Sequence, residues 1–260
     1  MPEPVLLGIP SSVWAGPLER RLAQQGGALV ASDAPALVAR DLREGKLAAA
    51  LLAPSDYARD SSAYQILPAC GVTAAGPYGP VRLHARRGVR AITRLAVDPS
   101  SSAEIILARI LLAEEFDSSP QIVPHPGPLA AMLEVAEAAL VLDAGGKDAD
   151  TGSQVSLDLV EVWQELTELP FVYGIWCAYE RALPEADARR IQAAHRDAEV
   201  EAEHLRAATP DEPAAAFVYS GQTLLEESMR EFLHYAYYHG ILPDVPELEY
   251  YRFGAADRSV

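Results

Sequence analysis

Short apolar runs alternate along the chain with longer stretches of helical periodicity. Buried strands are predicted for the apolar runs at residues 5–9, 48–53, 95–97, 139–142 and 169–177. Helices are predicted for the periodic stretches at residues 17–25, 35–46, 101–116, 126–138, 157–168, 184–208 and 221–240. This order is typical of βα units, so we expect an α/β protein with mixed, mostly parallel sheets.

Local signals refine this outline. Ser101, followed three residues later by Glu104, predicts a capping box that opens the helix at residues 101–116. Residues 71–82 are rich in glycine and proline, so we expect them to carry the chain from a first lobe to a second. The apolar run at residues 169–177 is suited to the return. We therefore expect a discontinuous first lobe (residues 1–88 and 177–260), a second lobe (residues 89–176) and a ligand cleft between them.

Composition limits the classes of partner. The chain has 260 residues with 37 acidic and 21 basic side chains, a formal net charge of −16. Such a charge repels nucleic acid and anionic membranes, so neither is expected as a partner. A small anionic ligand remains compatible, because local donors outweigh a diffuse field that is screened beyond roughly 10 Å.

Cysteine usage and apolar segments bear on the compartment. Cys70 and Cys177 are too few for a disulfide framework, so both are expected to fill the core in a reducing compartment. The first residues lack the pattern of a signal peptide. No apolar run approaches the roughly 20 residues needed to cross a bilayer. We expect a cytoplasmic protein.

Small polar residues follow four of the predicted strands: Ser11 and Ser12, Ser55, residues 100–102, and Asp143. In open α/β sheets, ligands bind outside the carboxyl ends of the strands. The first three of these ends also lead towards helix N-termini, where free N–H groups favour anions. Serine is equally common as a helix cap, so one serine alone indicates little. Their recurrence at successive strand ends predicts a site for a small carboxylated ligand.

Other candidate chemistry is weaker. The basic cluster Arg82, His84, Arg86 and Arg87 could guide an anionic substrate, or it could protect a solvated edge strand. The histidines show no metal-ligand spacing, and no glycine-rich phosphate loop is present. We therefore expect neither a metal nor a cofactor. Trp14 differs from the other aromatic residues because it follows directly on a pair of strand-end serines.

Five segments together resemble the chorismate dehydratase family of menaquinone biosynthesis. They are residues 50–57 (ALLAPSDY), 96–102 (AVDPSSS), 138–143 (AALVLD), 158–163 (DLVEVW) and 167–176 (TELPFVYGIW). They occur in the family's order over nearly the whole chain. The resemblance implies a two-lobed fold like that of the type II periplasmic solute-binding proteins, with a central cleft.

The resemblance also implies an activity. The family's lyases dehydrate chorismate to 3-[(1-carboxyvinyl)oxy]benzoate, the first step of the futalosine route to menaquinone. No cofactor is implied, and the substrate's own enolpyruvyl carboxylate is the suspected base. The residues then expected to line the cleft are Ser11, Ser12, Trp14, Ser55, Gly79, Pro80, Ser100, Ser102 and Asp143.

Roles follow for some of these residues. Ser100 and Ser102 would bind one carboxylate at a helix N-terminus, with Ser11 and Ser12 facing it from the other lobe. Trp14 would pack against the ring of the substrate. Asp143 is open to two readings, as acceptor of a proton from a substrate hydroxyl or as a loop cap.

The chain departs from the family pattern at two places. Trp14 ends a Ser-Val-Trp triplet where the family has Tyr-Leu-Asn, and Gly79 or Pro80 stands where the family has a serine. These departures favour an alternative, a non-catalytic cytoplasmic ligand-binding or sensing protein of the same fold. A second alternative is the sister enzyme 1,4-dihydroxy-6-naphthoate synthase, although residues 169–176 look more like the dehydratase.

Overall fold

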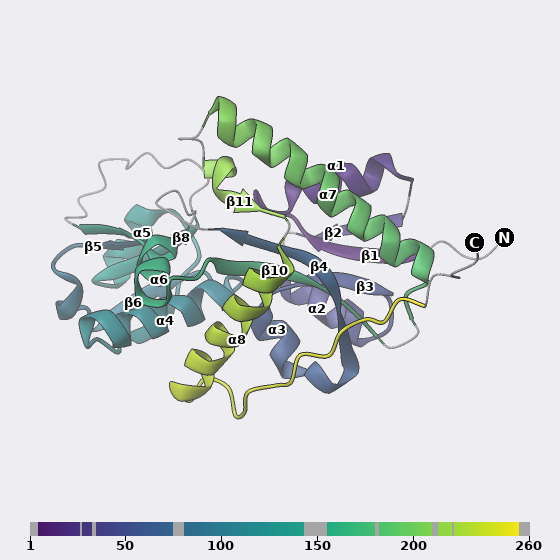
Figure 1. Cartoon of the computed structure of the whole chain (residues 1–260). Helices are drawn as coiled ribbons and strands as arrows, with labels where there is room; N and C mark the ends of the chain where they lie inside the picture. Colours follow the sequence, from purple (N-terminus) through teal and green to yellow (C-terminus); the bar gives the residue numbers. More distant parts are fainter. Residues whose placement is uncertain are drawn as a thin grey trace.

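The chain forms two β-sheets with helices packed on both (Figure 1). The computed structural model describes residues 5–26, 28–32, 35–74, 81–142, 155–179, 182–209, 213–219 and 221–254. Within these residues one sheet has six strands and the other has five. The predicted α/β class is confirmed.

The first sheet collects strands from both ends of the chain. Its strands are β1 (Leu6–Pro10), β2 (Ala28–Ser32), β3 (Ala49–Leu52), β4 (Tyr64–Ala74), β10 (Phe171–Tyr179) and β11 (Phe217–Val218). They lie in the order β11-β4-β10-β3-β1-β2. β1 pairs parallel with β2 and β3, whereas β10 pairs antiparallel with both β3 and β4.

The second sheet comes from one continuous part of the chain. Its strands are β5 (Val81–Ala85), β6 (Arg94–Val97), β7 (Gln121–Pro124), β8 (Ala138–Leu142) and β9 (Val155–Asp158). They lie in the order β7-β6-β8-β5-β9. Across the described strands of both sheets, four neighbouring pairs are parallel and five are antiparallel, so the sheets are mixed but not mostly parallel. Four of the antiparallel pairs involve β10 or β5, and the fifth joins β11 to β4.

Eight α-helices occur in the described part of the chain. They are α1 (Gly16–Gln24), α2 (Pro35–Arg43), α3 (Pro54–Arg59), α4 (Ser102–Phe116), α5 (Leu129–Val135), α6 (Leu159–Thr167), α7 (Glu185–Ala208) and α8 (Gln222–Tyr238). Figure 1 shows α1 and α7 over one face of the first sheet and α2, α3 and α8 over the other. None of the described helices is long and apolar enough to cross a membrane.

Two crossings connect the sheets, since the chain passes from β4 to β5 and returns from α6 to β10. The division into lobes at residues 88 and 176 stays a prediction. By sheet membership, β5 lies with the second sheet and all of β10 with the first. β5 lies between β8 and β9, so the reading of the basic cluster as protection for an edge strand is wrong. Arg82 instead forms an ion pair with Asp158, with Nη2 of Arg82 3.8 Å from Oδ2 of Asp158.

The larger of two hydrophobic clusters among the described residues runs through both sheets. At its centre Trp163 of α6, which is fully buried, meets Phe171 of β10 and both Phe232 and Tyr235 of α8. The ring centroids lie 5.7–6.4 Å from that of Trp163 in edge-to-face geometry, which aromatic pairs prefer. We call these four residues the aromatic seam. Through it, a helix packed on the second sheet is fixed to a helix packed on the first.

The C-terminal strap, residues 245–254, returns to the first sheet. Ile66 donates its N–H to the carbonyl of Glu249 at 2.7 Å and accepts one from Tyr251 at 2.9 Å. The hydroxyl of Tyr57 donates to the carbonyl of Glu247 at 2.7 Å. These bonds tie the strap to β4 and α3.

Candidate functional site

A small cavity lies between the two sheets, where several strands end. Its volume is about 30 Å³, which is room for roughly two water molecules. We call it the strand-end cavity. The polar and aromatic side chains that line it are Trp14, Asp56, Ser100, Ser102, Glu104 and Tyr173.

The topology explains why these residues meet. β1 and β3 are parallel neighbours, so their carboxyl ends lie at the same edge of the first sheet and lead to Trp14 and Asp56. β6 of the second sheet leads into the start of α4, which supplies Ser102 and Glu104. Such carboxyl ends are where open α/β sheets bind ligands. Tyr173 closes the cavity from β10.

The structure brings together only part of the predicted site. Trp14, Ser100 and Ser102 line the cavity, whereas Ser11, Ser12 and Ser55 are not among its lining residues. Gly79, Pro80 and Asp143 lie outside the described residues. That any of the nine binds substrate stays a prediction.

Some serines have structural partners. The Ser12 hydroxyl accepts the N–H of Ala15 at 3.3 Å in the turn before α1, as a helix cap does. The Ser100 hydroxyl donates to Asp98 Oδ1 at 2.7 Å, and its N–H donates to the same oxygen at 2.9 Å. Ser12 therefore fits the capping alternative, and Ser100 must exchange a bond with Asp98 before its hydroxyl donates to a ligand.

Trp14 forms one wall of the cavity. Its ring lies 5.8 Å from that of Tyr173, centroid to centroid, and its carbonyl accepts the Tyr219 hydroxyl at 3.0 Å. A Cβ on Gly174 would stand 2.9 Å from Trp14 Cζ3, closer than real Cβ contacts. Glycine at position 174 therefore lets the indole lie directly on β10.

The pattern reading missed three of the lining residues as site residues: Asp56, Glu104 and Tyr173. Asp56 is 4% exposed and pairs with Arg59 one turn later at 3.1 Å. Burial raises the pKa of Asp56, and the charge of Arg59 opposes that rise. Asp56 lies within the segment ALLAPSDY, of which only Ser55 was predicted to line the site.

Glu104 corrects the capping-box prediction. α4 begins at Ser102, close to the predicted start, but the Ser101 side chain makes no capping hydrogen bond. The Glu104 side chain lines the cavity instead. The first turns of α4 are mainly apolar and place Ala103, Ile106 and Leu107 in the core, whereas Glu115 near the end of the helix is exposed. That composition is the signal that a carboxylate in the first turn faces a protected environment.

Tyr173 adds an unsatisfied hydroxyl. Its side chain is 2% exposed, and its Oη has no hydrogen-bond partner among the described residues. Burial raises the pKa of Tyr173 well above its usual value, and the charges of Glu104 and Asp158 add to the effect. The hydroxyl thus remains protonated and can donate a hydrogen bond to a ligand.

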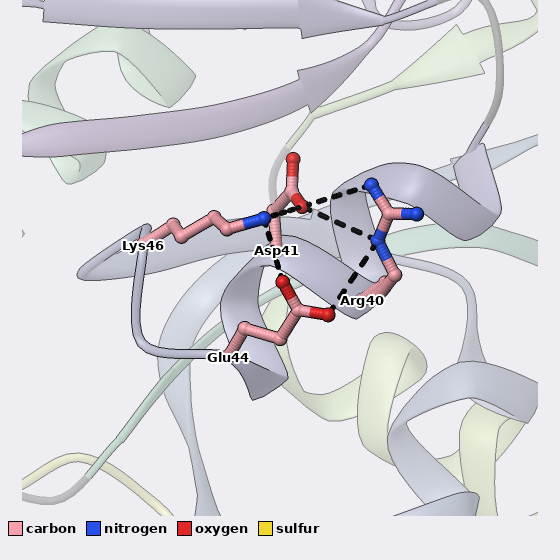
Figure 2. Close-up of polar contacts among 4 residues, drawn as sticks. All are labelled: Arg40, Asp41, Glu44 and Lys46. Carbon is pink, nitrogen blue, oxygen red and sulfur yellow. Dashed lines mark hydrogen bonds and ion pairs between the residues drawn. The ribbon is translucent and has the colours of Figure 1, made fainter.

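Carboxylates elsewhere are compensated differently. Figure 2 shows Asp41 and Glu44 with Arg40 and Lys46 around the end of α2. Lys46 Nζ lies 3.2 Å from Asp41 Oδ1 and 2.6 Å from Glu44 Oε2. Hydrogen bonds from Lys46, foremost, and Arg40 lower the pKa of Asp41. These acids are matched by bases in water, so the network is a surface feature of little energetic weight.

A larger hollow, of about 580 Å³, lies beside the C-terminal strap. Its polar lining includes Ser61, Ser62, Glu247, Glu249 and Arg252. No strand carboxyl end contributes to it, and the strap forms one of its sides. We therefore take the smaller strand-end cavity as the candidate site on topological grounds.

No cluster of three or more metal-binding side chains occurs in the described ranges. His195 is buried, and burial lowers its pKa to about 4. Its Nδ1 lies 2.9 Å from the carbonyl of Tyr219. The imidazole is therefore neutral at physiological pH and holds the segment around Tyr219 to α7.

Comparison with solved structures identifies the class of fold. The periplasmic aliphatic sulphonate binding protein SsuA of Escherichia coli superposes with a TM-score of 0.58 at 14% identity, covering 100% of this chain and 97% of that one. Protein AF1704 from Archaeoglobus fulgidus gives a TM-score of 0.65 at 17% identity over 91% and 98% of the two chains. The protein has the periplasmic-binding-protein fold, as the resemblance implied.

The sequence then identifies the family. Residues 16–238 match the family described as menaquinone biosynthesis, so the chain belongs to that family. The chorismate dehydratase of Thermus thermophilus is 25% identical over 197 residues, which is 70% of this chain and 72% of that protein. The predicted family relationship is confirmed.

Proposed function

We propose that this protein is a lyase that dehydrates chorismate to 3-[(1-carboxyvinyl)oxy]benzoate. Membership of the menaquinone-biosynthesis family and the similarity to the Thermus chorismate dehydratase support this reaction. The observation that carries it is the strand-end cavity, where β1 and β3 of one sheet meet the start of α4 from the other.

Chorismate carries two carboxylates, and the cavity offers a place for one of them. Ser102 is the first residue of α4, a helix of 15 residues whose initial N–H groups have no partner within the helix. A helix N-terminus with serine hydroxyls favours an anion. Ser100 would join after releasing Asp98.

The reaction asks little of the protein. Loss of the ring hydroxyl together with a ring proton makes the ring aromatic, so the driving force lies in the substrate. The site must orient the ring, exclude water and keep the substrate's own enolpyruvyl carboxylate near the ring proton. Trp14 and Tyr173 supply aromatic walls for the ring.

Binding requires the cavity to enlarge, because small-molecule pockets measure about 300–1,000 Å³ and this one measures about 30 Å³. Separation of the two sheets or rotation of Trp14 would supply the space. The same observation favours a second candidate, a binding protein without turnover in which Trp14 fills part of the ligand position.

The test is incubation of the purified protein with chorismate, followed by chromatography of chorismate and the enolpyruvyl benzoate. We expect product above the background of heat-denatured protein. Ser102→Ala should lower kcat/KM at least tenfold, with exposed Ser62→Ala as a matched control that leaves it unchanged. Binding of the benzoate in calorimetry without product formation would favour the second candidate. Neither turnover nor binding would reject both.

A further inference from the structure

Glu104 occupies an unusual position for a carboxylate. It lies in the first turn of α4, is partly buried and lines the strand-end cavity with Trp14, Ser102 and Tyr173. It is not used in a capping box, since Ser101 makes no side-chain cap bond. None of the five segments that carry the family resemblance contains Glu104, so its presence in the cavity needs its own explanation.

The groups that face Glu104 come from three elements. Asp56 of α3 lines the same cavity and carries Arg59 at 3.1 Å as its counter-ion. Tyr173 of β10 presents a hydroxyl that lacks a partner among the described residues. Ser102 lies two residues earlier, at the start of α4 itself, and also lines the cavity. No basic side chain lines the cavity in the part of the chain that the structure describes.

This environment decides the protonation state of Glu104. Burial, foremost, raises the pKa of Glu104 to about 7; its own backbone N–H opposes the rise and the charge of Asp56 adds to it. The charge of Arg59 opposes the rise in the pKa of Asp56, whereas Glu104 has no basic partner in the cavity lining. A bound dianion would favour the neutral carboxyl further.

We propose that Glu104 is the proton donor to the hydroxyl that leaves chorismate. The inference rests on the proposed dehydratase function and adds a protein group to it. Glu104 and the α4 N-terminus lie side by side, so a substrate held by one carboxylate at Ser102 has its ring beside the Glu104 carboxyl. In this arrangement Ser102 would bind the substrate carboxylate and Glu104 would donate the proton, and both residues lie in the first turn of α4.

The C–H bond at the ring carbon bearing the enol ether breaks, and the enolpyruvyl carboxylate of the substrate takes that proton. The electron pair forms the new ring double bond as the C–O bond of the neighbouring carbon breaks. The departing oxygen takes the proton of Glu104 and leaves as water. Solvent then removes the proton from the product carboxyl and returns one to Glu104, so the net reaction releases only water.

The other titratable groups of the cavity fit this role less well. Asp56 is paired with Arg59, and this counter-ion stabilises the charged form of the carboxylate. The pKa of Tyr173 is raised well above its usual value, which makes its hydroxyl a hydrogen-bond donor and a poor acid. A general acid works best with a pKa near the working pH, and the pKa of Glu104, about 7, meets that condition.

The test compares wild type, Glu104→Gln, Glu104→Asp and Glu115→Gln as purified proteins with chorismate. Glu115 is exposed on the same helix and serves as the control. For Glu104→Gln we expect kcat to fall roughly 10²- to 10⁴-fold with KM changed less than about threefold. Wild-type kcat should decline with an alkaline limb at or above pH 7, the limb should be absent in Glu104→Gln, and Glu104→Asp should recover part of kcat.

The outcomes separate two failures. Wild type that forms no product rejects the dehydratase function, and the donor role falls with it. Wild type that is active beside an equally active Glu104→Gln with the same pH profile rejects the donor role alone. A low kcat in Glu104→Gln that keeps the alkaline limb also rejects it, because the limb would then belong to another group.

Discussion

The aromatic seam and the strand-end cavity both join the two sheets, yet their chemistry is opposite. In the seam, Trp163 meets three aromatic rings edge-to-face and donates its indole N–H to the carbonyl of Pro170 at 3.4 Å. In the cavity, Glu104 is partly buried and Tyr173 is fully buried, and no basic side chain is among the described residues that line the cavity. The two regions are in contact through Phe171 and Tyr173, whose ring centroids lie 5.0 Å apart. We therefore expect the seam residues to stabilise the junction between the sheets, whereas we propose that the neighbouring cavity residues take part in the reaction.

Removing the Trp163 side chain from the aromatic seam should have the largest effect on stability. Trp163→Ala leaves a cavity among three aromatic rings, so we expect the free energy of unfolding to fall by about 3–5 kcal/mol. Urea denaturation followed by circular dichroism measures it. Tyr238→Ala, at a side chain that is 81% exposed, is the control and should change stability by less than about 0.5 kcal/mol. A loss below about 1 kcal/mol for Trp163→Ala would contradict the assigned role of the seam.

Replacing Glu104 by a neutral residue should have the next largest effect on the free energy of unfolding, and it should raise that free energy at alkaline pH. The pKa of Glu104 rises from 4.5 to about 7 on folding, so the folded state binds the proton more tightly between these pH values. Its contribution to stability is therefore fully present below pH 4.5 and is lost as pH rises through about 7. Glu104→Gln removes the ionised form. It should be more stable than wild type at pH 8 by at most about 3 kcal/mol and indistinguishable at pH 4.5.

Parallel urea titrations at the two pH values test this. Glu115→Gln again serves as control, because an exposed carboxyl should give the same difference from wild type at both. Equal stability of wild type and Glu104→Gln at pH 8 would show that Glu104 is not held in a poorly solvated place.

A smaller effect is expected where Trp14 lies on β10. A Cβ at position 174 would contact Trp14 Cζ3 at 2.9 Å and Leu51 Cδ1 at 3.2 Å. Gly174→Ala should therefore destabilise by about 1–3 kcal/mol in wild type. In a Trp14→Ala background the loss should shrink by at least about 1 kcal/mol, which a double-mutant cycle measures. Additive effects of the two changes would disprove the proposed close contact.

The smallest effect on folding is expected at the cavity tyrosine. Tyr173 Oη is buried without a partner among the described residues, so Tyr173→Phe removes an unsatisfied group and should leave stability unchanged or raise it by up to about 1 kcal/mol. Tyr238 is 81% exposed and is not among the cavity-lining residues. Tyr238→Phe is therefore the control, with unchanged stability and no change in turnover. A drop above about 1 kcal/mol for Tyr173→Phe would indicate a hydrogen bond in solution.

The strands that lead to the site could be predicted from the sequence, because each is an apolar run closed by proline or serine. β1, β3 and β6 start or end within one residue of the predicted ranges. β2 and β4 were not predicted. β2 is only half-buried, so its pattern is weak, and β4 contains Pro68 and Gly71, which normally interrupt strands.

The candidate site was predictable only in part for a different reason. Serines after strands stand out in a sequence, yet Ser12 and Ser100 turn out to bond with their own turns. Glu104 was assigned to a cap because local spacing cannot show which side of a helix meets another sheet. Tyr173 lay within an apolar run, where nothing in the pattern separates a hydroxyl pointed at a cavity from one pointed into the core.

The nesting of the sheets along the chain has a consequence for synthesis on the ribosome. The second sheet is complete once residue 158 has been made, whereas the first waits for β11 at Phe217–Val218. Domains generally fold as their residues emerge. We therefore expect the five-stranded sheet to assemble first. Until β10 has been made, the edges of β3 and β4 with which it later pairs stay open to chaperones. The strap arrives last, and only then does Ile66 gain its two backbone partners.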